Sequence, residues 1–189
     1  MLQVTSTETP HLTAGSLNLR TITEQDADAF YEIFSDAPTL KYWSDGPIKE
    51  RDEAHKLVKQ EIKFAQSENC INWGIALPDT NFLIGKFTLF NFHKQNRRAE
   101  VGYVLNRAYW GKGYMSKVMT RVLAFAFDEL SLHRLEADTD PDNVGSLALL
   151  EKFGFQREGY FRERWYVREQ WLDSVMLGLL RDEYQRGQS

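Results

Sequence analysis

The stretch from residue 100 to 127, EVGYVLNRAYWGKGYMSKVMTRVLAFAF, constrains the fold more than any other part of this chain. An alternating strand pattern leads into Gly-Lys-Gly at 111–113, and a long segment with one apolar face follows at once. A glycine turn that opens a helix presents main-chain N–H groups without intrahelical acceptors, and the helix dipole adds positive charge there. Such a turn binds anions, above all phosphate groups. We therefore expect a strand, a phosphate-binding turn and a helix in direct succession.

Two well-known phosphate loops do not match this turn. The P-loop requires a glycine, four residues and then Gly-Lys-Ser/Thr, whereas here Gly113 follows Lys112 and Gly102 lies too far upstream. The dinucleotide fingerprint requires a third glycine where this chain has Ser116. The alternative to a phosphate site is a tight strand-to-helix turn that binds nothing.

Composition excludes several classes of protein. A chain of 189 residues with 42% apolar and 13% aromatic residues suits one globular domain. The formal net charge of -4 argues against a nucleic-acid partner, because nucleic-acid-binding domains are normally basic. Apolar runs fall short of the roughly 20 residues of a membrane span. No nucleic-acid or membrane partner is expected.

Metal and targeting signals are also weak. Cys70 is the only cysteine, so an internal disulfide and a cysteine-rich zinc site are ruled out, and the four histidines are scattered without ligand spacing. We expect no metal. Residues 1–15 show neither the basic nor the apolar part of a signal peptide, and we interpret them as a flexible leader on a cytoplasmic protein.

The remaining patterns predict one α+β domain over residues 16–182, followed by a tail at 183–189. Strands are predicted at 16–21, 72–77, 82–90, 98–105, 133–138, 155–165 and 171–179, and helices at 23–34, 49–67, 115–130 and 145–153. Thr23 and Asp26 predict a capping box at the first helix. We expect a mixed, mostly antiparallel sheet in which the strands flanking the 115–130 helix form one parallel pair.

The order of strand, glycine turn, helix and strand, followed by N-x-x-S-x-x-x-L-E-K-x-G-F, resembles the GCN5-related N-acetyltransferase (GNAT) superfamily. It is most similar to the RimJ/RimL-like branch, which acetylates protein N-termini. The resemblance spans residues 16–182 and is carried by SLNLRTITEQDADAFYEIF (16–34), AEVGYVL (99–105), YWGKGYMS (109–116), HRLEADTDPDNVGSLALLEKFGFQREGYFRERW (133–165) and WLDSVMLGLL (171–180). It implies a three-layer α/β/α fold with a splayed parallel pair and helices on both faces of the sheet.

The resemblance further implies acetyl-CoA as co-substrate. In the family's phosphate turn, Gln/Arg-x-x-Gly-x-Gly/Ala, Trp110 takes the first position, Gly113 the central glycine and Met115 the last small position. The pantetheine arm would lie along residues 103–105 as an added strand. The implied cofactor-binding residues are Tyr103, Val104, Leu105, Trp110, Gly111, Lys112, Gly113, Tyr114, Met115, Ser116, Asn143, Ser146 and Lys152. The alternative role of Asn143 is a helix N-cap.

The predicted catalytic residues are Glu100 and Ser146. Glu100 matches a strand carboxylate that acts as base in some members of the superfamily; the alternative is an exposed glutamate in a cross-strand ion pair. Many members place a tyrosine where this chain has Leu150, so Ser146 is the candidate acid. Its alternative is a serine that hydrogen-bonds a helix carbonyl. Glu163 and Asp173 are interpreted as surface charge.

The acceptor is expected to enter between the loop at 35–47 and the strands at 160–172. Aromatic residues are abundant there, and among them only Trp43 is assigned to acceptor binding. The predicted reaction moves an acetyl group from acetyl-CoA to a primary amine by direct attack in a ternary complex. The amine belongs to a protein N-terminus or a small molecule. A non-catalytic acyl-CoA-binding regulatory module is the alternative, and a homodimer remains an option.

Overall fold

The computed structural model describes residues 9–67 and 69–187. Eight strands form one sheet in the order β1-β2-β3-β4-β5-β6-β8-β7. The strands are β1 (Leu12–Ala14), β2 (Leu17–Arg20), β3 (Cys70–Ala76), β4 (Leu83–His93), β5 (Arg98–Leu105), β6 (Arg134–Thr139), β7 (Gln156–Val167) and β8 (Gln170–Leu180). The helices are α1 (Ala27–Phe34), α2 (Arg51–Ala65), α3 (Tyr114–Ala124), α4 (Val144–Lys152) and α5 (Arg181–Arg186), with short helical turns η1 (Glu24–Asp26), η2 (Arg107–Tyr109) and η3 (Phe125–Glu129). Strands β5 and β6 pair in parallel, and the other neighbouring strands of the described chain pair antiparallel.

The predicted helices and strands are all present, and the fold is the mixed sheet expected. The predicted capping box is also present, because the Thr23 N–H donates a hydrogen bond of 2.8 Å to the Asp26 carboxylate. The predicted helix at 115–130 divides into α3 and the π-helical turn η3. The predicted strand at 98–105 coincides with β5.

Both chain ends are more ordered than predicted within the described residues. The flexible leader is a wrong prediction for Leu12–Ala14, because β1 pairs with β2 there and buries Leu12 and Ala14. Three residues are too few to show strand alternation. At the other end, α5 crosses the expected boundary after residue 182, and Tyr184 stacks on Phe127 with ring centroids 4.9 Å apart. Residues 1–8 of the leader and 188–189 of the tail lie outside the described residues.

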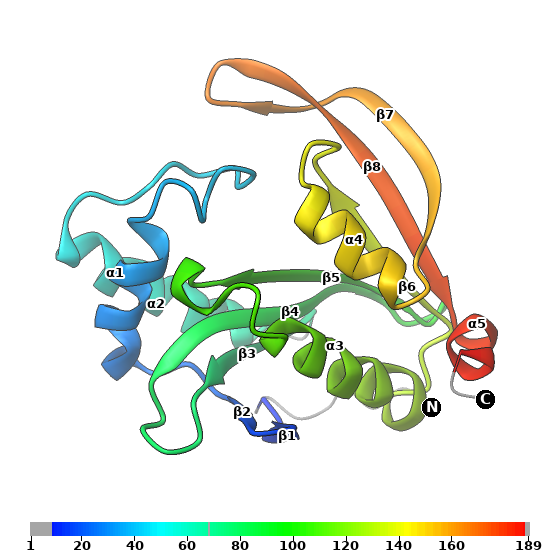
Figure 1. Ribbon diagram of the computed structural model, residues 1–189, viewed down its shortest axis with the longest axis horizontal. Helices are drawn as coiled ribbons and strands as arrows, with labels where there is room; N and C mark the ends of the chain where they lie inside the picture. Colours follow the sequence, from blue (N-terminus) through cyan, green and yellow to red (C-terminus); the bar gives the residue numbers. More distant parts are fainter. Residues whose placement is uncertain (1–8, 68, 188–189) are drawn as a thin grey trace.

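Helices cover both faces of the sheet, which gives the predicted three layers (Figure 1). Helices α3 and α4 share one apolar cluster with the face that carries Trp73, Phe87 and Leu135. Helices α1 and α2 form a second apolar cluster on the other face, which Val104 joins from β5. One sheet therefore supports two cores, and β5 contributes to both.

The face of β3 and β4 that meets α2 also buries polar groups. Lys86 donates a hydrogen bond of 2.5 Å to Glu61 of α2, and the two side chains are only 10% and 12% exposed. Asn72 donates to the same carboxylate at 2.7 Å, and Thr88 donates to Asn72 at 2.8 Å. A buried charge is tolerated when it is paired and hydrogen-bonded, so α2 is held to the sheet partly by this network.

The parallel pairing between β5 and β6 is short. It joins Arg98 to Arg134, Ala99 to Leu135 and Glu100 to Glu136, and then stops. Beyond that point β5 stays with β4 as far as Leu105, while β6 stays with β8 as far as Thr139. The two strands therefore part in the middle of the sheet, as the resemblance implied. Figure 1 shows β6, β8 and β7 rising away from the rest of the sheet.

The Lys86–Glu61 pair gives a test of the packing. Substitution Glu61→Ala would leave the Lys86 ammonium buried without its partner, so we expect the free energy of unfolding to fall by about 3 kcal/mol in urea denaturation. The exposed pair between Lys59 and Glu24 provides the control. Substitution Lys59→Ala should change stability by less than about 0.5 kcal/mol. A loss below about 1 kcal/mol for Glu61→Ala would show that the pair does not stabilise the fold.

Candidate functional site

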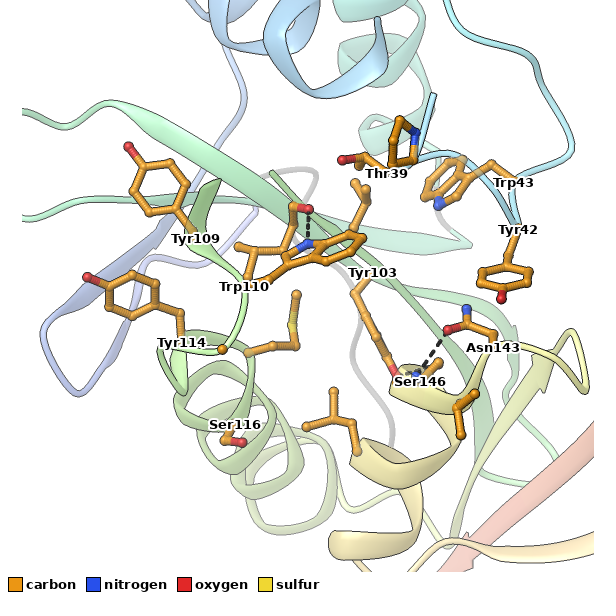
Figure 2. Close-up of a pocket in the computed structure, with 18 of the residues that line it drawn as sticks. Thr39, Tyr42, Trp43, Tyr103, Tyr109, Trp110, Tyr114, Ser116, Asn143 and Ser146 are labelled. Carbon is orange, nitrogen blue, oxygen red and sulfur yellow. Dashed lines mark hydrogen bonds between the residues drawn. The ribbon is translucent and has the colours of Figure 1, made fainter. Parts of the chain in front are cut away.

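A cavity of about 540 Å³ lies where β5 and β6 separate. Its volume falls within the range of small-molecule sites. Its walls come from the loop after α1, the end of β5, the glycine turn before α3 and the start of α4 (Figure 2). The lining residues are Pro38, Thr39, Tyr42, Trp43, Tyr103, Val104, Leu105, Tyr109, Trp110, Gly111, Gly113, Tyr114, Met115, Ser116, Asp142, Asn143, Val144, Gly145, Ser146 and Leu149.

The glycine turn presents bare main chain to this cavity. Gly111 and Gly113 have φ of 70° and 72°, a left-handed conformation that favours glycine. A Cβ added to either residue would meet no atom within 4 Å, so a side chain there would occupy the open space above the turn. The Lys117 N–H bonds to the Gly113 carbonyl at 3.2 Å, and the N–H groups before it belong to the first helical turn. These features are those of an anion-binding helix start.

Two basic residues predicted for the cofactor lie beside this turn. Lys152 of α4 donates a hydrogen bond of 3.3 Å to Ser116. The Lys112 ammonium lies 5.2 Å from the centre of the Tyr109 ring. The turn therefore combines main-chain donors with nearby cations, which is favourable for phosphate groups.

Trp110 fastens the turn to β5. Its indole N–H donates a hydrogen bond of 2.7 Å to the Leu105 carbonyl, the last residue of the strand (Figure 2). The ring is about half exposed and lines the cavity. A tryptophan at this position thus fixes how far the glycine turn stands from the strand edge.

Ser146 meets a phenol in the cavity. The hydroxyl oxygens of Ser146 and Tyr103 are 2.8 Å apart, a hydrogen bond between α4 and β5. Burial raises the pKa of Tyr103 to about 12, although the hydrogen bond with Ser146 acts in the opposite direction. Tyr103 is therefore protonated throughout the neutral range and available as a donor. Leu150, which stands where many family members have a tyrosine, is buried in the core, so Tyr103 supplies the phenol of this site.

Asn143 begins α4. Its side-chain oxygen accepts a hydrogen bond of 3.1 Å from the Ser146 N–H, so the N-cap role predicted as the alternative is confirmed. Figure 2 shows its amide nitrogen turned away from α4, toward Tyr42. The Tyr42 hydroxyl donates a hydrogen bond of 2.7 Å to the Asp142 carbonyl. The loop after α1 therefore touches the start of α4 across the cavity.

Trp43, the residue predicted to bind the acceptor, forms part of the cavity wall. Its ring meets Phe34 edge-on, with centroids 5.6 Å apart. The Lys86 ammonium lies 5.5 Å from the centre of the same ring. These contacts hold the indole from behind, on the side of the second apolar cluster.

Glu100 does not line the cavity. It sits at the last parallel pair, opposite Glu136, before the strands separate. The Asn91 side chain donates a hydrogen bond of 3.1 Å to its carboxylate. Two candidate partners for a cross-strand ion pair, Arg98 and Lys86, are engaged elsewhere, because Arg98 pairs with Glu136 and Lys86 with Glu61. The predicted base therefore lies where β5 and β6 are still paired and not in the wall of the cavity.

The carboxylates on the hairpin of β7 and β8 also lie outside the lining. Asp173 accepts hydrogen bonds from the Tyr160 hydroxyl at 2.5 Å and from the Glu163 N–H at 2.7 Å. The hydrogen bond from Tyr160 is the main reason that the pKa of Asp173 is lowered. The aromatic residues Trp165 and Trp171 are exposed and do not reach the cavity.

Several lining residues escaped the sequence analysis. These are Pro38, Thr39, Tyr42, Tyr109, Asp142, Val144, Gly145 and Leu149. Pro38, Thr39 and Tyr42 fall within the loop expected at the acceptor entrance. Each of the others except Leu149 stands next to a predicted residue. No group of three His, Cys, Asp or Glu side chains suited to a metal ion occurs in residues 9–67 and 69–187. Nor is any helix of this described part long and apolar enough to cross a membrane.

Residues 16–156 match the family model described as the acetyltransferase (GNAT) domain. The chain belongs to this family. The uncharacterized N-acetyltransferase YoaA of Bacillus subtilis (strain 168) is 34% identical over 157 residues, which cover 83% of this chain and 89% of that protein. A GNAT-family acetyltransferase of Bacillus anthracis has a crystal structure that matches with a TM-score of 0.81 and 28% identity, over 92% of this chain and all of that one (100%).

Two more distant relatives have named substrates. The [ribosomal protein uS5]-alanine N-acetyltransferase of Escherichia coli (strain K12) is 26% identical over 185 residues, covering 93% of each chain. The spermidine N(1)-acetyltransferase of Vibrio cholerae is 23% identical over 168 residues, covering 89% of this chain and 95% of that protein. These two relatives are thus named for an alanine of a ribosomal protein and for spermidine.

The bare turn gives a binding prediction. Substitution Gly113→Ala places a methyl group in the open space over the main-chain donors, so we expect affinity for coenzyme A to fall about tenfold or more by calorimetry. Substitution Gly154→Ala is the matched control, because Gly154 also has a left-handed φ, 88°, but does not line the cavity. Equal affinities for the two variants would mean that the turn does not hold the phosphates.

Proposed function

We propose that this protein transfers the acetyl group of acetyl-CoA to a primary amine within the cavity between β5 and β6. The observation that carries the proposal is the coincidence of two features at one place. The parallel pairing stops after Glu100, and a bare glycine turn faces the resulting opening. An opening in a sheet can take an extended chain along its edge, and the turn can take the phosphates at the end of that chain.

The residues at the cavity suit acetyl-CoA. The turn from Gly111 to Ser116 would hold the pyrophosphate, with Lys112 and Lys152 supplying positive charge. The edge of β5 at residues 103–105 would hold the pantetheine arm, and Asn143 would contribute its remaining amide donor. Bound acetyl-CoA supplies a thioester carbonyl that is activated toward an amine.

Ser146 and Tyr103 would serve the departing sulfur. Their hydroxyl groups are joined at 2.8 Å, so one of them can donate to the other while the second donates into the cavity. The raised pKa of Tyr103 keeps its proton in place, which makes the pair a hydrogen-bond donor and not a base. A donor of this kind stabilises a thiolate as it leaves.

The acceptor must arrive as a neutral amine. An α-amine with a pKa near ~8 is roughly 10% neutral at pH 7, whereas a lysine amine with a pKa near ~10.4 is about 0.04% neutral. Asp142 is the one carboxylate among the described lining residues. A site with little basic assistance suits an amine of low pKa, such as a protein N-terminus. A small-molecule amine remains the other acceptor class, because relatives act on both.

Two measurements test this function. Thermal shifts with acetyl-CoA, coenzyme A and ATP compare the ligands, since a bound ligand raises apparent stability. Release of free thiol from acetyl-CoA is then followed with an alanine-starting peptide and with spermidine. Stabilisation by ATP alone would contradict the cofactor assignment. Stabilisation by acetyl-CoA without thiol release from a broad set of amines would favour the non-catalytic acyl-CoA-binding module.

The Ser146–Tyr103 pair predicts a graded loss of turnover. Substitution Ser146→Ala removes the donor to sulfur, and we expect kcat to fall about 100-fold, in the range of proton-transfer catalysis. Substitution Tyr103→Phe removes its support, and we expect a smaller loss of about tenfold. Tyr166→Phe is the control, because this tyrosine is exposed on β7 and does not line the cavity. Full turnover in Ser146→Ala would rule out the assigned acid.

A Glu100 variant tests whether this residue acts as the base. Its carboxylate is bonded to Asn91 and lies outside the cavity lining, so it could act only through intervening water. We expect Glu100→Gln to keep kcat within about threefold of the unmodified enzyme. A loss of about 100-fold without loss of coenzyme A affinity would instead establish Glu100 as the base.

A further inference from the structure

Arg168 joins two distant segments of the chain. It lies at the tip of the hairpin formed by β7 and β8, and its Nη2 atom donates to three main-chain carbonyls of the loop after α1. The acceptors are Leu40 at 3.2 Å, Trp43 at 3.0 Å and Asp45 at 2.9 Å. In Figure 1 the hairpin tip extends toward the side of the molecule where this loop runs. One guanidinium therefore gathers three carbonyls from a six-residue stretch.

The hairpin turn is built from unfavourable residues. Val167 pairs with Gln170, so Arg168 and Glu169 form a two-residue turn, with φ of 49° and 63°. Turns of this kind strongly prefer asparagine or glycine, because other side chains are strained in the left-handed region. An arginine here costs stability within the hairpin itself. Its contacts with the loop offset that cost.

The loop that Arg168 holds forms one side of the cavity. Tyr42 and Trp43 line the cavity from this loop. The Trp43 ring rests on Phe34 and Lys86, and its carbonyl is one of the three acceptors of Arg168. Arg168 itself does not line the cavity, so it can affect the cavity wall only by holding this loop. Among the described residues, the hydrogen bonds of Arg168 go to this loop and not to the glycine turn.

We propose that Arg168 is a positioning residue for the acceptor: the hairpin tip latches the loop at 40–45 and fixes Trp43 as the acceptor-facing wall. The role in acceptor binding rests on the proposed function, but the contact between Arg168 and the loop does not. Because Arg168 donates to the loop and not to the glycine turn, we expect the latch to act on the acceptor and to leave acetyl-CoA binding unchanged. Only the shape of the loop is recognised, since all three acceptors are main-chain atoms.

Three variants of the full chain separate the latch from the turn. Substitution Arg168→Asn suits the left-handed turn better and removes the latch, so the hairpin should fold at least as well as before. Substitution Arg168→Lys keeps a cation that can reach fewer carbonyls. Substitution Glu169→Asn relieves the same turn without touching the latch, and is the matched control.

Hydrogen exchange of the loop amides reports on the latch without any ligand. The N–H groups of Leu40 and Trp43 are bonded within the loop, to Asp36 and Leu40 respectively, and should exchange slowly while the loop is held. We expect exchange across residues 40–45 to quicken about tenfold in Arg168→Asn, less in Arg168→Lys, and not in Glu169→Asn. Unchanged exchange in Arg168→Asn would overturn the latch, whether or not the protein turns over any amine.

Steady-state kinetics tests the second part of the proposal. With an alanine-starting peptide or spermidine as acceptor, Arg168→Asn should raise the acceptor KM about fivefold or more, with partial rescue in Arg168→Lys. The KM for acetyl-CoA should stay within about twofold. An unchanged acceptor KM alongside faster loop exchange would show that the latch is structural only. If the unmodified protein acetylates neither probe, the proposed function fails for those amines, while the exchange result still decides the latch.

Discussion

The short parallel pairing between β5 and β6 is the constraint on which the site depends. Three residue pairs hold the strands together, and each strand then continues with its outer neighbour, β4 or β8. Neither strand loses support on both edges, so the sheet can open internally without unravelling. Main-chain polar groups inside the opening remain available to a ligand. The glycine turn, Tyr103 and the start of α4 all gather at this opening.

The sequence was informative where its signals are local. The glycine turn, the strand before it and the N-cap at Asn143 each depend on neighbouring residues, and all three are present. The contact between Tyr103 and Ser146 was not foreseen, because these residues are 43 positions apart. They meet only where the strands diverge. No local pattern reports the position of that divergence.

Glu100 illustrates the same limit from the other side. Alternation in a strand tells which face a side chain occupies, but it does not tell at which residue two neighbouring strands separate. The parallel pairing ends at Glu100 itself. The Glu100 carboxylate therefore lies where the strands are still paired, and it accepts a hydrogen bond from Asn91. β1 and α5 were missed for a simpler reason, since elements of three and six residues show too little periodicity.

Arg168 recognises only carbonyl oxygens, and every residue type has one. Side chains at positions 40–45 can therefore be exchanged by mutation while the hydrogen bonds between the hairpin and the loop persist. Substitutions at these positions could therefore change which acceptors the cavity accepts, without removing the contacts that hold the loop in place.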